Sequence, residues 1–519
     1  MNERKYPIGI QNFESLRKDG YVYVDKTALV YKLVNTGRYY FLSRPRRFGK
    51  SLLLSTIEAY LQGKRELFEG LAIESLEKEW TKHPILHLDL NTEKYTTPEA
   101  LENILNDALN GWEELYGRRE SERSLSLRFQ GIIQRASERT GERVVILVDE
   151  YDKPMLQAIG RPDLQEAYRN TLKAFYGALK SKDGCIKFAM LTGVTKFGKV
   201  SVFSDLNNLK DISMRNDYAD ICGISEEELL YVFDEDIRVL AESNGMSYEE
   251  TLARLRENYN GYHFCEDCIG VYNPFSLLNT FDAKIFRSYW FETGTPTYLV
   301  ELLKMHHYNL NEMAHEKATA DVLNSIDSTS TNPIPVIYQS GYLTIKDYDK
   351  EFEVYSLGFP NREVEEGFVK FLLPFYTRVA AQQTGFEIQN FVREVRSGDV
   401  DAFLCRLQSL FADTSYEQIK RDQEVHYQNV LFIVSKLMGF YVKAEYHTVN
   451  GRIDLLLQTD KYIYVMEFKL DGTAEEALRQ IQDKGYALPF RSDVRKVFKV
   501  GVNFSNETRN IERWVVEEE

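Results

Sequence analysis

Residues 39–53 read YYFLSRPRRFGKSLL, and this stretch decides the fold of the N-terminal half. The apolar run over 39–42 is typical of a short buried strand, and the leucines after Ser51 open an apolar helix. Gly49, Lys50 and Ser51 stand between the two. That arrangement is what a phosphate-binding loop requires, because the first N–H groups of the helix face the anion and the helix dipole favours negative charge.

Different residues of this loop are expected to bind different parts of a nucleoside triphosphate and its metal ion. We expect Lys50 to reach the β- and γ-phosphates of ATP and the Ser51 hydroxyl to bind Mg²⁺. The usual pattern begins with glycine, where this chain has Arg44, and two more arginines add positive charge beside the phosphates. The alternative is a basic turn at a helix start that binds nothing. The predicted ATP-binding residues are Arg44, Pro45, Arg46, Arg47, Phe48, Gly49, Lys50, Ser51, Leu52 and Thr192.

A second stretch supplies the acids that such a site needs. Residues 144–152 read VVILVDEYD, a buried strand that ends in two carboxylates. In parallel α/β sheets the C-terminal edge of the strands is where ligands bind. Asp149 is therefore predicted to hold Mg²⁺, directly or through water, and Glu150 to orient or deprotonate the attacking water. A further strand ends near Thr192 and Thr195; either can sense the γ-phosphate, and the alternative for both is a structural role.

The order of the elements predicts the fold class. Strands and helices alternate through residues 1–215, which favours an α/β fold with a parallel sheet and helices on both faces. The predicted strands are Tyr39–Leu42, Ile85–Leu90, Val144–Val148 and Phe188–Leu191, and a helix is predicted over Leu164–Lys180. Residues 216–390 are predicted to form a helical connector of one or two modules.

Local signals place the elements of that connector. Ser225 with Glu228 and Ser247 with Glu250 have the spacing of helix capping boxes. Pro274 follows Asn273, which suits the first turn of a helix. We also expect a hairpin over 341–357 that turns at 347–350, and a helix from Asn361 toward Thr377.

Residues 395–519 are predicted to form a small α/β domain with its own site. Two amphipathic helices lead into a hairpin that turns at 459–461. The predicted elements are the strands Arg452–Gln458 and Tyr462–Lys469, the helix Ala474–Tyr486 and the strand Lys496–Val502.

A group of two acids and a lysine falls on this hairpin. Glu467 and Lys469 share one face of their strand because side chains alternate across it, and the hairpin can bring Asp454 beside them. Two carboxylates can hold a hard cation, and a nearby lysine can position water or stabilise charge on a cleaved phosphate. Glu424 on the preceding helix is a candidate third acid. The alternative is a set of plain surface ion pairs.

Composition excludes several classes of protein. The chain of 519 residues has 64 basic and 79 acidic residues, a net charge of −15, which excludes a nucleic-acid-coating protein but not a nucleic-acid substrate. No apolar run reaches the roughly 18 residues of a membrane helix. Five cysteines indicate a reducing, cytoplasmic setting. The single Cys265–Cys268 pair lacks the second pair that zinc needs, so we expect thiols there.

Parts of this chain resemble two known families. SRPRRFGKS, VVILVDEYDKP and LTGVTKFGKVSVFSDLNNL resemble the AAA-ATPase-like family of bacterial P-loop proteins, over roughly residues 4–215, and an arginine at the first loop position is that family's own form. GRIDLLL, MEFKL and QIQDKGYA resemble the PD-(D/E)XK nuclease superfamily, over roughly 410–516. This resemblance implies that Asp454, Glu467 and Lys469 are the acid, acid and lysine of the catalytic motif. It also implies that Glu424 is the acid of the preceding helix and that Gln480 and Tyr486 belong to the trailing helix motif. In the segment 216–390, YNGYHF and YNPFSLLN resemble the helical and winged modules found after such ATPase domains, which implies a winged-helix-like connector.

Three functions compete on this sequence. The first is an ATPase that drives or gates a nuclease using Mg²⁺ or Mn²⁺ on nucleic acid, with DNA favoured over RNA. The second is an ATP-dependent regulatory switch whose C-terminal domain binds nucleic acid or protein without cutting. The third is a purely structural interaction protein. Under this hypothesis both groups of residues are coincidental. No arginine can be assigned as the one that AAA-type rings insert from a neighbour, and the oligomeric state stays open.

Lys50→Ala is expected to abolish or severely weaken ATP binding and to leave the fold intact, because the lysine supplies a point charge to the phosphates. Calorimetric titration with ATP, alongside a thermal melt, measures both properties. Unchanged affinity in the variant would contradict the phosphate-loop assignment.

Overall fold

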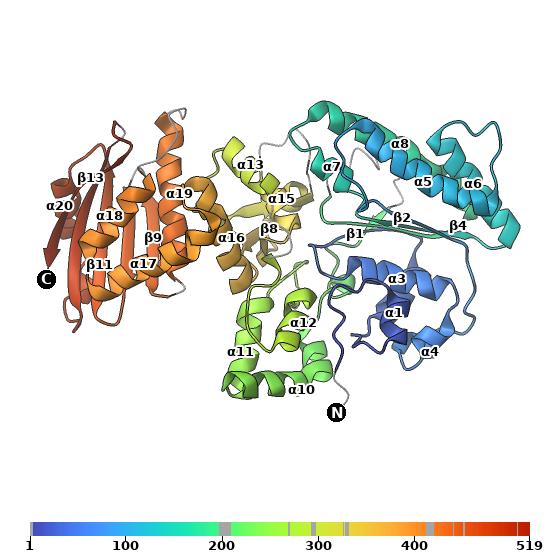
Figure 1. Ribbon diagram of the computed structural model, residues 1–519, viewed down its shortest axis with the longest axis horizontal. Coiled ribbons are helices and arrows are strands. Elements are labelled where there is room, and N and C mark those ends of the chain that lie inside the picture. The colour runs from blue at the N-terminus through green and yellow to red at the C-terminus, as the bar shows by residue number, and fades with distance from the viewer. Residues whose placement is uncertain are drawn as a thin grey trace. The chain divides into compact units, whose positions relative to one another are not determined.

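A computed structural model gives the fold in two compact units, which are shown in Figure 1. The described residues are 4–196, 209–267, 270–291, 297–324, 326, 332–411, 420–439, 441–449, 452–505 and 507–518, with the backbone alone for 297–298, 301, 314–315, 420–424, 446–449 and 452–454. Unit 1 comprises Met1–Thr293 and Lys317–Arg362, and unit 2 comprises Gly294–Glu316 and Glu363–Glu519. The predicted domains 1–215, 216–390 and 395–519 have boundaries that differ from those of the two units, and this division into domains stays a prediction.

The expected parallel sheet is confirmed in unit 1. Within the described residues it has five strands in the order β2-β3-β4-β1-β5, and all neighbouring strands are parallel. Their bounds are β1 Tyr39–Ser43, β2 Ile85–Asp89, β3 Val144–Asp149, β4 Ile186–Gly193 and β5 Lys210–Asp211. Every residue of β1 and β3 is buried, as expected for strands that are covered on both faces.

Helices cover both faces of this sheet. Figure 1 shows α5 (Pro98–Tyr116), α6 (Leu125–Thr140) and α8 (Pro162–Ser181) on one face, and α3 (Lys50–Leu61) with α1 (Phe13–Lys18) and α4 (Ala72–Leu76) on the other. The other elements here are α2 Thr27–Thr36, α7 Lys153–Gln157 and the short 3₁₀ helices η1 Arg65–Phe68, η2 Asp183–Cys185 and η3 Asn216–Tyr218.

The rest of unit 1 combines helices with a small antiparallel sheet. The helices are α10 Glu226–Asn244, α11 Tyr248–Tyr259, α12 Pro274–Ala283, α14 Ala320–Asn324 and α15 Ile334–Gln339, and the strands, in the order β6-β8-β7, are β6 Lys317–Thr319, β7 Thr344–Asp349 and β8 Val354–Gly358. Both capping boxes are confirmed, and Asn273 caps α12. The hairpin turns at 350–353, three residues later than predicted, because the ladder continues to Asp349 opposite Val354.

Unit 2 is built on a mixed sheet in the order β13-β12-β11-β10-β9, in which only β11 and β12 pair in parallel among the described strands. The strands are β9 Lys443–Val449, β10 Arg452–Gln458, β11 Tyr462–Leu470, β12 Lys496–Ser505 and β13 Asn510–Glu518. The helices are α13 Thr297–Met305, α16 Arg362–Tyr376, α17 Thr384–Ser397, α18 Val400–Phe411, α19 Lys420–Gly439 and α20 Ala474–Lys484, with η5 Glu312–His315, η6 Ala381–Gln383 and η7 Leu488–Phe490.

The sequence predictions missed the two edge strands of this sheet. β9 reads KAEYHTV and β13 reads NIERWVVEE, so both carry charged and polar residues. Edge strands are commonly charged because charge discourages pairing with another chain, and this weakens the apolar alternation that reveals a strand. None of the helices in the described part of the chain is long and apolar enough to cross a membrane.

Gly501→Ala is expected to destabilise unit 2 by about 1–3 kcal/mol, because overpacking forces the backbone to shift. A Cβ at Gly501 in β12 would lie 2.1 Å from the carbonyl oxygen of Ala474 and 2.5 Å from the amide nitrogen of Leu478, both backbone atoms of α20. Urea unfolding measures the loss. Gly385→Ala in α17 is the control, since its Cβ meets nothing within 4 Å. Equal midpoints in the two variants would contradict this packing.

Candidate functional site

A short loop joins β1 to α3 where the sequence predicts phosphate binding. Gly49 caps the helix with a φ of 89°, and Arg47 has a φ of 66°. Left-handed backbone at such positions turns neighbouring N–H groups toward one side and forms the concave arrangement that binds anions. The loop therefore has the backbone form that a phosphate needs.

The lysine of the loop is buried and folded against its own loop. Lys50 has 4% of its side chain exposed, and its Nζ donates to the carbonyl oxygens of Arg44 at 3.2 Å and Pro45 at 3.3 Å. The same Nζ lies 3.5 Å from Oε1 of Glu150. A buried ammonium must be paired, and these are weak partners that a phosphate oxygen can replace.

The guanidinium of Arg44 has a different role from the one expected. Its side chain is buried, and its Nη atoms donate to backbone oxygens instead of facing the loop. The acceptors are the carbonyls of Ser43, Ser213, Tyr218 and Ala219. Its Cζ lies 4.0 Å from the centre of the Phe264 ring. The expectation that its charge lies beside the phosphates is corrected, because this charge binds the loop to the segment after β5.

The acid at the end of β3 joins three elements. Asp149 accepts a hydrogen bond from the Ser51 hydroxyl of α3 at 2.5 Å and from the Thr192 hydroxyl of β4 at 2.6 Å. The structure thus brings together three residues that the sequence analysis selected from three separate stretches. A hydroxyl and a carboxylate are hard oxygen donors, so Ser51 and Asp149 fit Mg²⁺.

Glu150 is held in a strained backbone conformation beside this acid. Its φ is 53°, which is rare for a residue with a side chain, and its amide donates to Oδ1 of Asp149 at 3.0 Å. Such strain costs on the order of 1 kcal/mol and persists where the surroundings enforce it. The turn directs the Glu150 carboxylate to Lys50, which places it at the mouth of the loop.

Sequence reasoning missed Asp152, which organises the end of β4. Its buried carboxylate accepts from the amides of Val194 at 3.2 Å and Thr195 at 2.6 Å, and from the Thr195 hydroxyl at 2.7 Å. Burial, together with the charge of Glu150, raises the pKa of Asp152 to about 6. The Thr195 hydroxyl is therefore engaged in this turn. The VDEYD motif contained the residue, but nothing in it separates the third acid from a solvated loop end.

Asp89 at the end of β2 was also missed. It is in register with Asp149 on the neighbouring parallel strand. Burial and the charge of Asp149 raise the pKa of the Asp89 carboxyl. Its position at the end of the strand ILHLD was the available signal, since that edge collects ligand-binding groups.

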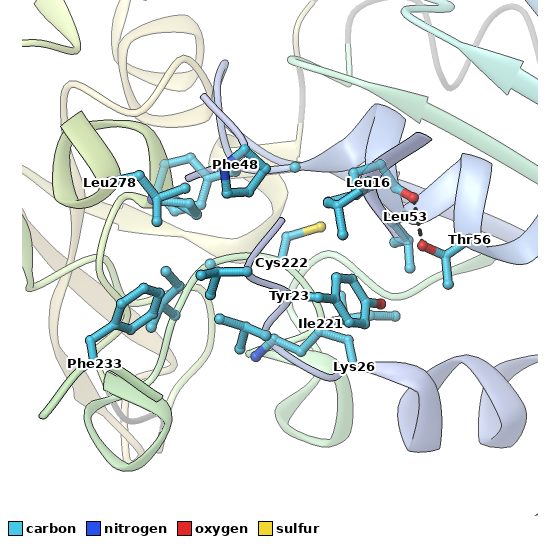
Figure 2. A pocket seen from close by; sticks show the side chains of 18 residues that line it. Leu16, Tyr23, Lys26, Phe48, Leu53, Thr56, Ile221, Cys222, Phe233 and Leu278 are labelled. Atoms are coloured by element: carbon cyan, nitrogen blue, oxygen red, sulfur yellow. Dashed lines mark hydrogen bonds between the residues drawn. The ribbon is translucent and has the colours of Figure 1, made fainter. Parts of the chain in front are cut away.

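An apolar pocket opens beside the loop, and no sequence pattern predicted it. It has a volume of about 640 Å³, part of it open to solvent, and it lies between the segment before α2, the start of α3, and residues 221–224 with α10 and α12. Figure 2 shows Cys222 amid the labelled side chains, with Phe48 and Leu278 on one side and Tyr23 on the other. Burial raises the pKa of the Cys222 thiol.

The charge at the pocket wall is neutralised. Lys26 lines the pocket, and its Nζ lies 2.6 Å from a carboxylate oxygen of Glu228, which also accepts from the amide of Ser225 in the capping box of α10. Gly49 of the phosphate loop and Leu52 in the first turn of α3 line the same pocket. A flat apolar group attached to a phosphate chain would therefore meet both features at once.

The second group of predicted residues lies on the β10–β11 hairpin, whose pairing is confirmed. Asp454 stands opposite Glu467 in the antiparallel register. Glu467 is buried, with 1% exposed, and Lys469 two residues later is partly buried. The side chains of Asp454 and Glu424 lie outside the described residues. Among those described, no three acidic, histidine or cysteine side chains form a cluster that could hold a metal ion.

The residues of the trailing helix lie next to this hairpin. Gln480 is in α20, which contacts β11 and β12, and Tyr486 follows the helix and packs on the cluster that includes Ile463 and Val465. Those two residues of β11 share its face with Glu467. Cys268 lies outside the described residues, so the expectation for the cysteine pair stays a prediction.

Comparison with known proteins matches both regions. A family model described as "Predicted AAA-ATPase" matches residues 7–203, and one described as "PD-(D/E)XK nuclease superfamily" matches residues 422–514. An uncharacterized protein in the vnfD 5′ region of Azotobacter chroococcum mcd 1 is 35% identical over 530 residues, which cover 100% of this chain and 99% of that protein. The name of this relative states no activity.

Cys222→Phe is expected to weaken ATP binding about tenfold or more, because the ring would fill the apolar pocket beside the loop, where a flat base attached to the phosphates would lie. Binding of inorganic tripolyphosphate should be unchanged, since the loop itself is intact. Competition against a fluorescent nucleotide measures both, with Cys405→Phe, an exposed site in unit 2, as the control. An equal loss of ATP and tripolyphosphate affinity would contradict the separation of pocket and loop.

Proposed function

The chain belongs to the family of proteins that join an AAA-ATPase-like domain to a PD-(D/E)XK nuclease superfamily domain, and from this we propose that it is an ATP hydrolase that controls a metal-dependent nuclease. The proposed substrate of the second domain is nucleic acid, with DNA favoured over RNA, in the cytoplasm. The observation that carries the ATPase half is the Asp149 carboxylate, which joins the Ser51 and Thr192 hydroxyls.

We assign the binding of ATP to the loop and the apolar pocket. Lys50 exchanges its loop carbonyls for the β- and γ-phosphate oxygens, and the N–H groups at the start of α3 face the same phosphates. The base lies in the pocket beside Phe48. Ser51 and Asp149 hold Mg²⁺, which when bound neutralises charge on the β- and γ-phosphates.

Glu150 is proposed as the base of the hydrolysis step. It accepts a proton from the water whose oxygen attacks the γ-phosphorus, and the bond from that phosphorus to the bridging oxygen of ADP breaks. The products are ADP and inorganic phosphate. Once Lys50 binds phosphate, Glu150 loses its present partner and is available to this water. The strained φ of Glu150 supports this role, because strain of this kind clusters at functional sites.

The C-terminal domain is proposed to cut a phosphodiester. Asp454 and Glu467 would hold a divalent cation, Mg²⁺ or Mn²⁺, which when bound stabilises charge on the phosphate and activates water. Lys469 would stabilise the charge that develops on the cleaved phosphate. The burial of Glu467 supports the proposal, because a carboxylate in a sheet core needs a cation or another partner.

Asp454→Ala, Glu467→Ala and Lys469→Ala are each expected to reduce cleavage about 100-fold or more, and to leave ATP hydrolysis unchanged, because Lys50 lies in the other unit. The assay follows linear and circular DNA and RNA on gels, with and without ATP. It belongs at low ionic strength, since the net charge of −15 implies weak binding that salt weakens further.

Two residues of the same hairpin provide matched controls for that assay. Asp460 and Lys461 lie in the exposed turn, so Asp460→Ala and Lys461→Ala should cut like the wild type. Cleavage that survives Asp454→Ala or a chelator would indicate a contaminating nuclease. No cleavage by the wild type on any substrate would favour the regulatory switch that binds without cutting.

A further inference from the structure

Hydrolysis of ATP spreads negative charge over the γ-phosphoryl oxygens, and P-loop enzymes neutralise it with an arginine from the same chain or from a neighbour. We therefore ask which residues of this chain supply this cation. The inference rests on the proposed function. Lys50 already serves the ground-state phosphates. A second cation must lie near Glu150, where water attacks.

Lys153 is fixed at that place. It begins α7, three residues after Glu150, and its amide donates to the Glu150 carbonyl oxygen at 3.1 Å. Its Nζ donates to Asn91 just beyond the end of β2, at 2.8 Å to the carbonyl oxygen and 2.5 Å to Oδ1. The ammonium is thereby held over the ends of β2 and β3, the edge that carries Asp89 and Asp149.

No ion pair with a described residue cancels the charge of Lys153. Within the described residues its Nζ binds only the neutral groups of Asn91. Burial lowers the pKa of Lys153; the Glu150 and Asp89 carboxylates oppose this shift and Arg46 adds to it. Lys153 therefore lies in the electrostatic field of Glu150, Asp89 and Arg46. A cation held by an amide keeps its charge for a ligand, because neutral acceptors do not neutralise it.

Arg46 is the arginine of the loop whose guanidinium has no partner among the described residues. Arg44 is buried among carbonyls, and the Arg47 guanidinium lies 4.9 Å from the centre of the Phe275 ring. The Arg46 side chain is exposed and makes no hydrogen bond or ion pair with the described residues, while its carbonyl oxygen accepts from Nε1 of Trp290 at 3.0 Å. The backbone is thus anchored and the guanidinium is available.

We propose that Lys153 and Arg46 together supply, from within one chain, the positive charge that stabilises the γ-phosphoryl group during hydrolysis. They approach it from the start of α7 and from the phosphate loop, on the side where Glu150 activates water. The bonds that form and break are those of the proposed reaction, and the two cations neither gain nor lose a proton. Hydrolysis then needs no neighbouring subunit, so turnover per chain is independent of protein concentration.

The test compares ground-state binding with binding of a transition-state mimic. The full chain is titrated with a fluorescent ADP, with and without aluminium fluoride in Mg²⁺, which together mimic the transferring phosphoryl group. Lys153→Met should bind ADP within about threefold of the wild type, and Arg46→Gln should lose far less affinity for ADP than for the aluminium fluoride complex. Their affinity for the aluminium fluoride complex should fall about 10²- to 10³-fold, and ATP turnover in parallel.

Controls separate this role from a general loss of charge or fold. Lys94→Met and Arg143→Gln change exposed residues of the same unit, the second at the opposite end of β3, and should match the wild type. Lys153→Arg keeps the charge and should restore most of the mimic affinity. A thermal melt of each variant confirms folding.

The outcomes distinguish the inference from the function on which it rests. Wild-type affinity for the aluminium fluoride complex in both Lys153→Met and Arg46→Gln would overturn the inference alone. Turnover per chain that rises steeply with protein concentration would also overturn it, since a neighbour would then supply the cation. A wild type that binds no ADP would overturn the proposed function, and the inference with it.

Discussion

The carboxylate of Asp149 is the point on which the N-terminal site depends. It accepts hydrogen bonds from hydroxyls of α3 and β4 and from the amide of Glu150, so one side chain fixes three elements relative to one another. Hydrogen bonds to a charged acceptor are stronger than neutral ones. The strand order makes this possible, because β4 lies between β3 and β1, and the loop that follows β1 therefore ends beside β3 and β4.

The arrangement also explains why the loop is ready for a ligand. Lys50 is buried and contacts carbonyls of its own loop and the Glu150 carboxylate at 3.2–3.5 Å, distances at the long end for such contacts. A triphosphate offers the same ammonium charged oxygens that can approach it more closely. Binding therefore separates Lys50 from Glu150, and the two groups take different partners.

Local chemistry made much of this predictable from the sequence. The strand before Gly49 and the helix after it, the buried strand that ends at Asp149, and the capping boxes each depend on residues that are close in the chain. The hairpin that sets Asp454 opposite Glu467 follows from two apolar runs around a short turn. These signals depend on residues that are close in the chain, so the sequence displays them directly.

The features that escaped prediction depend on contacts between distant residues. The sequence predicts that Arg44 binds phosphate, but in the structure its guanidinium donates to the carbonyls of Ser213 and Tyr218, which are distant in the chain. The apolar pocket joins Tyr23 with Cys222 and Leu278, which no periodicity connects. Lys153 acquires its position from Asn91, 62 residues earlier.

The most direct measurement of the central claim is a crystal structure of the chain with a non-hydrolysable ATP analogue and Mg²⁺. The account predicts phosphates at the loop, Lys50 bound to them and separated from Glu150, the metal at Ser51 and Asp149, and the base beside Phe48 and Cys222. A nucleotide bound elsewhere, or a loop in which Lys50 still contacts Glu150 and its own carbonyls at saturating analogue, would contradict it.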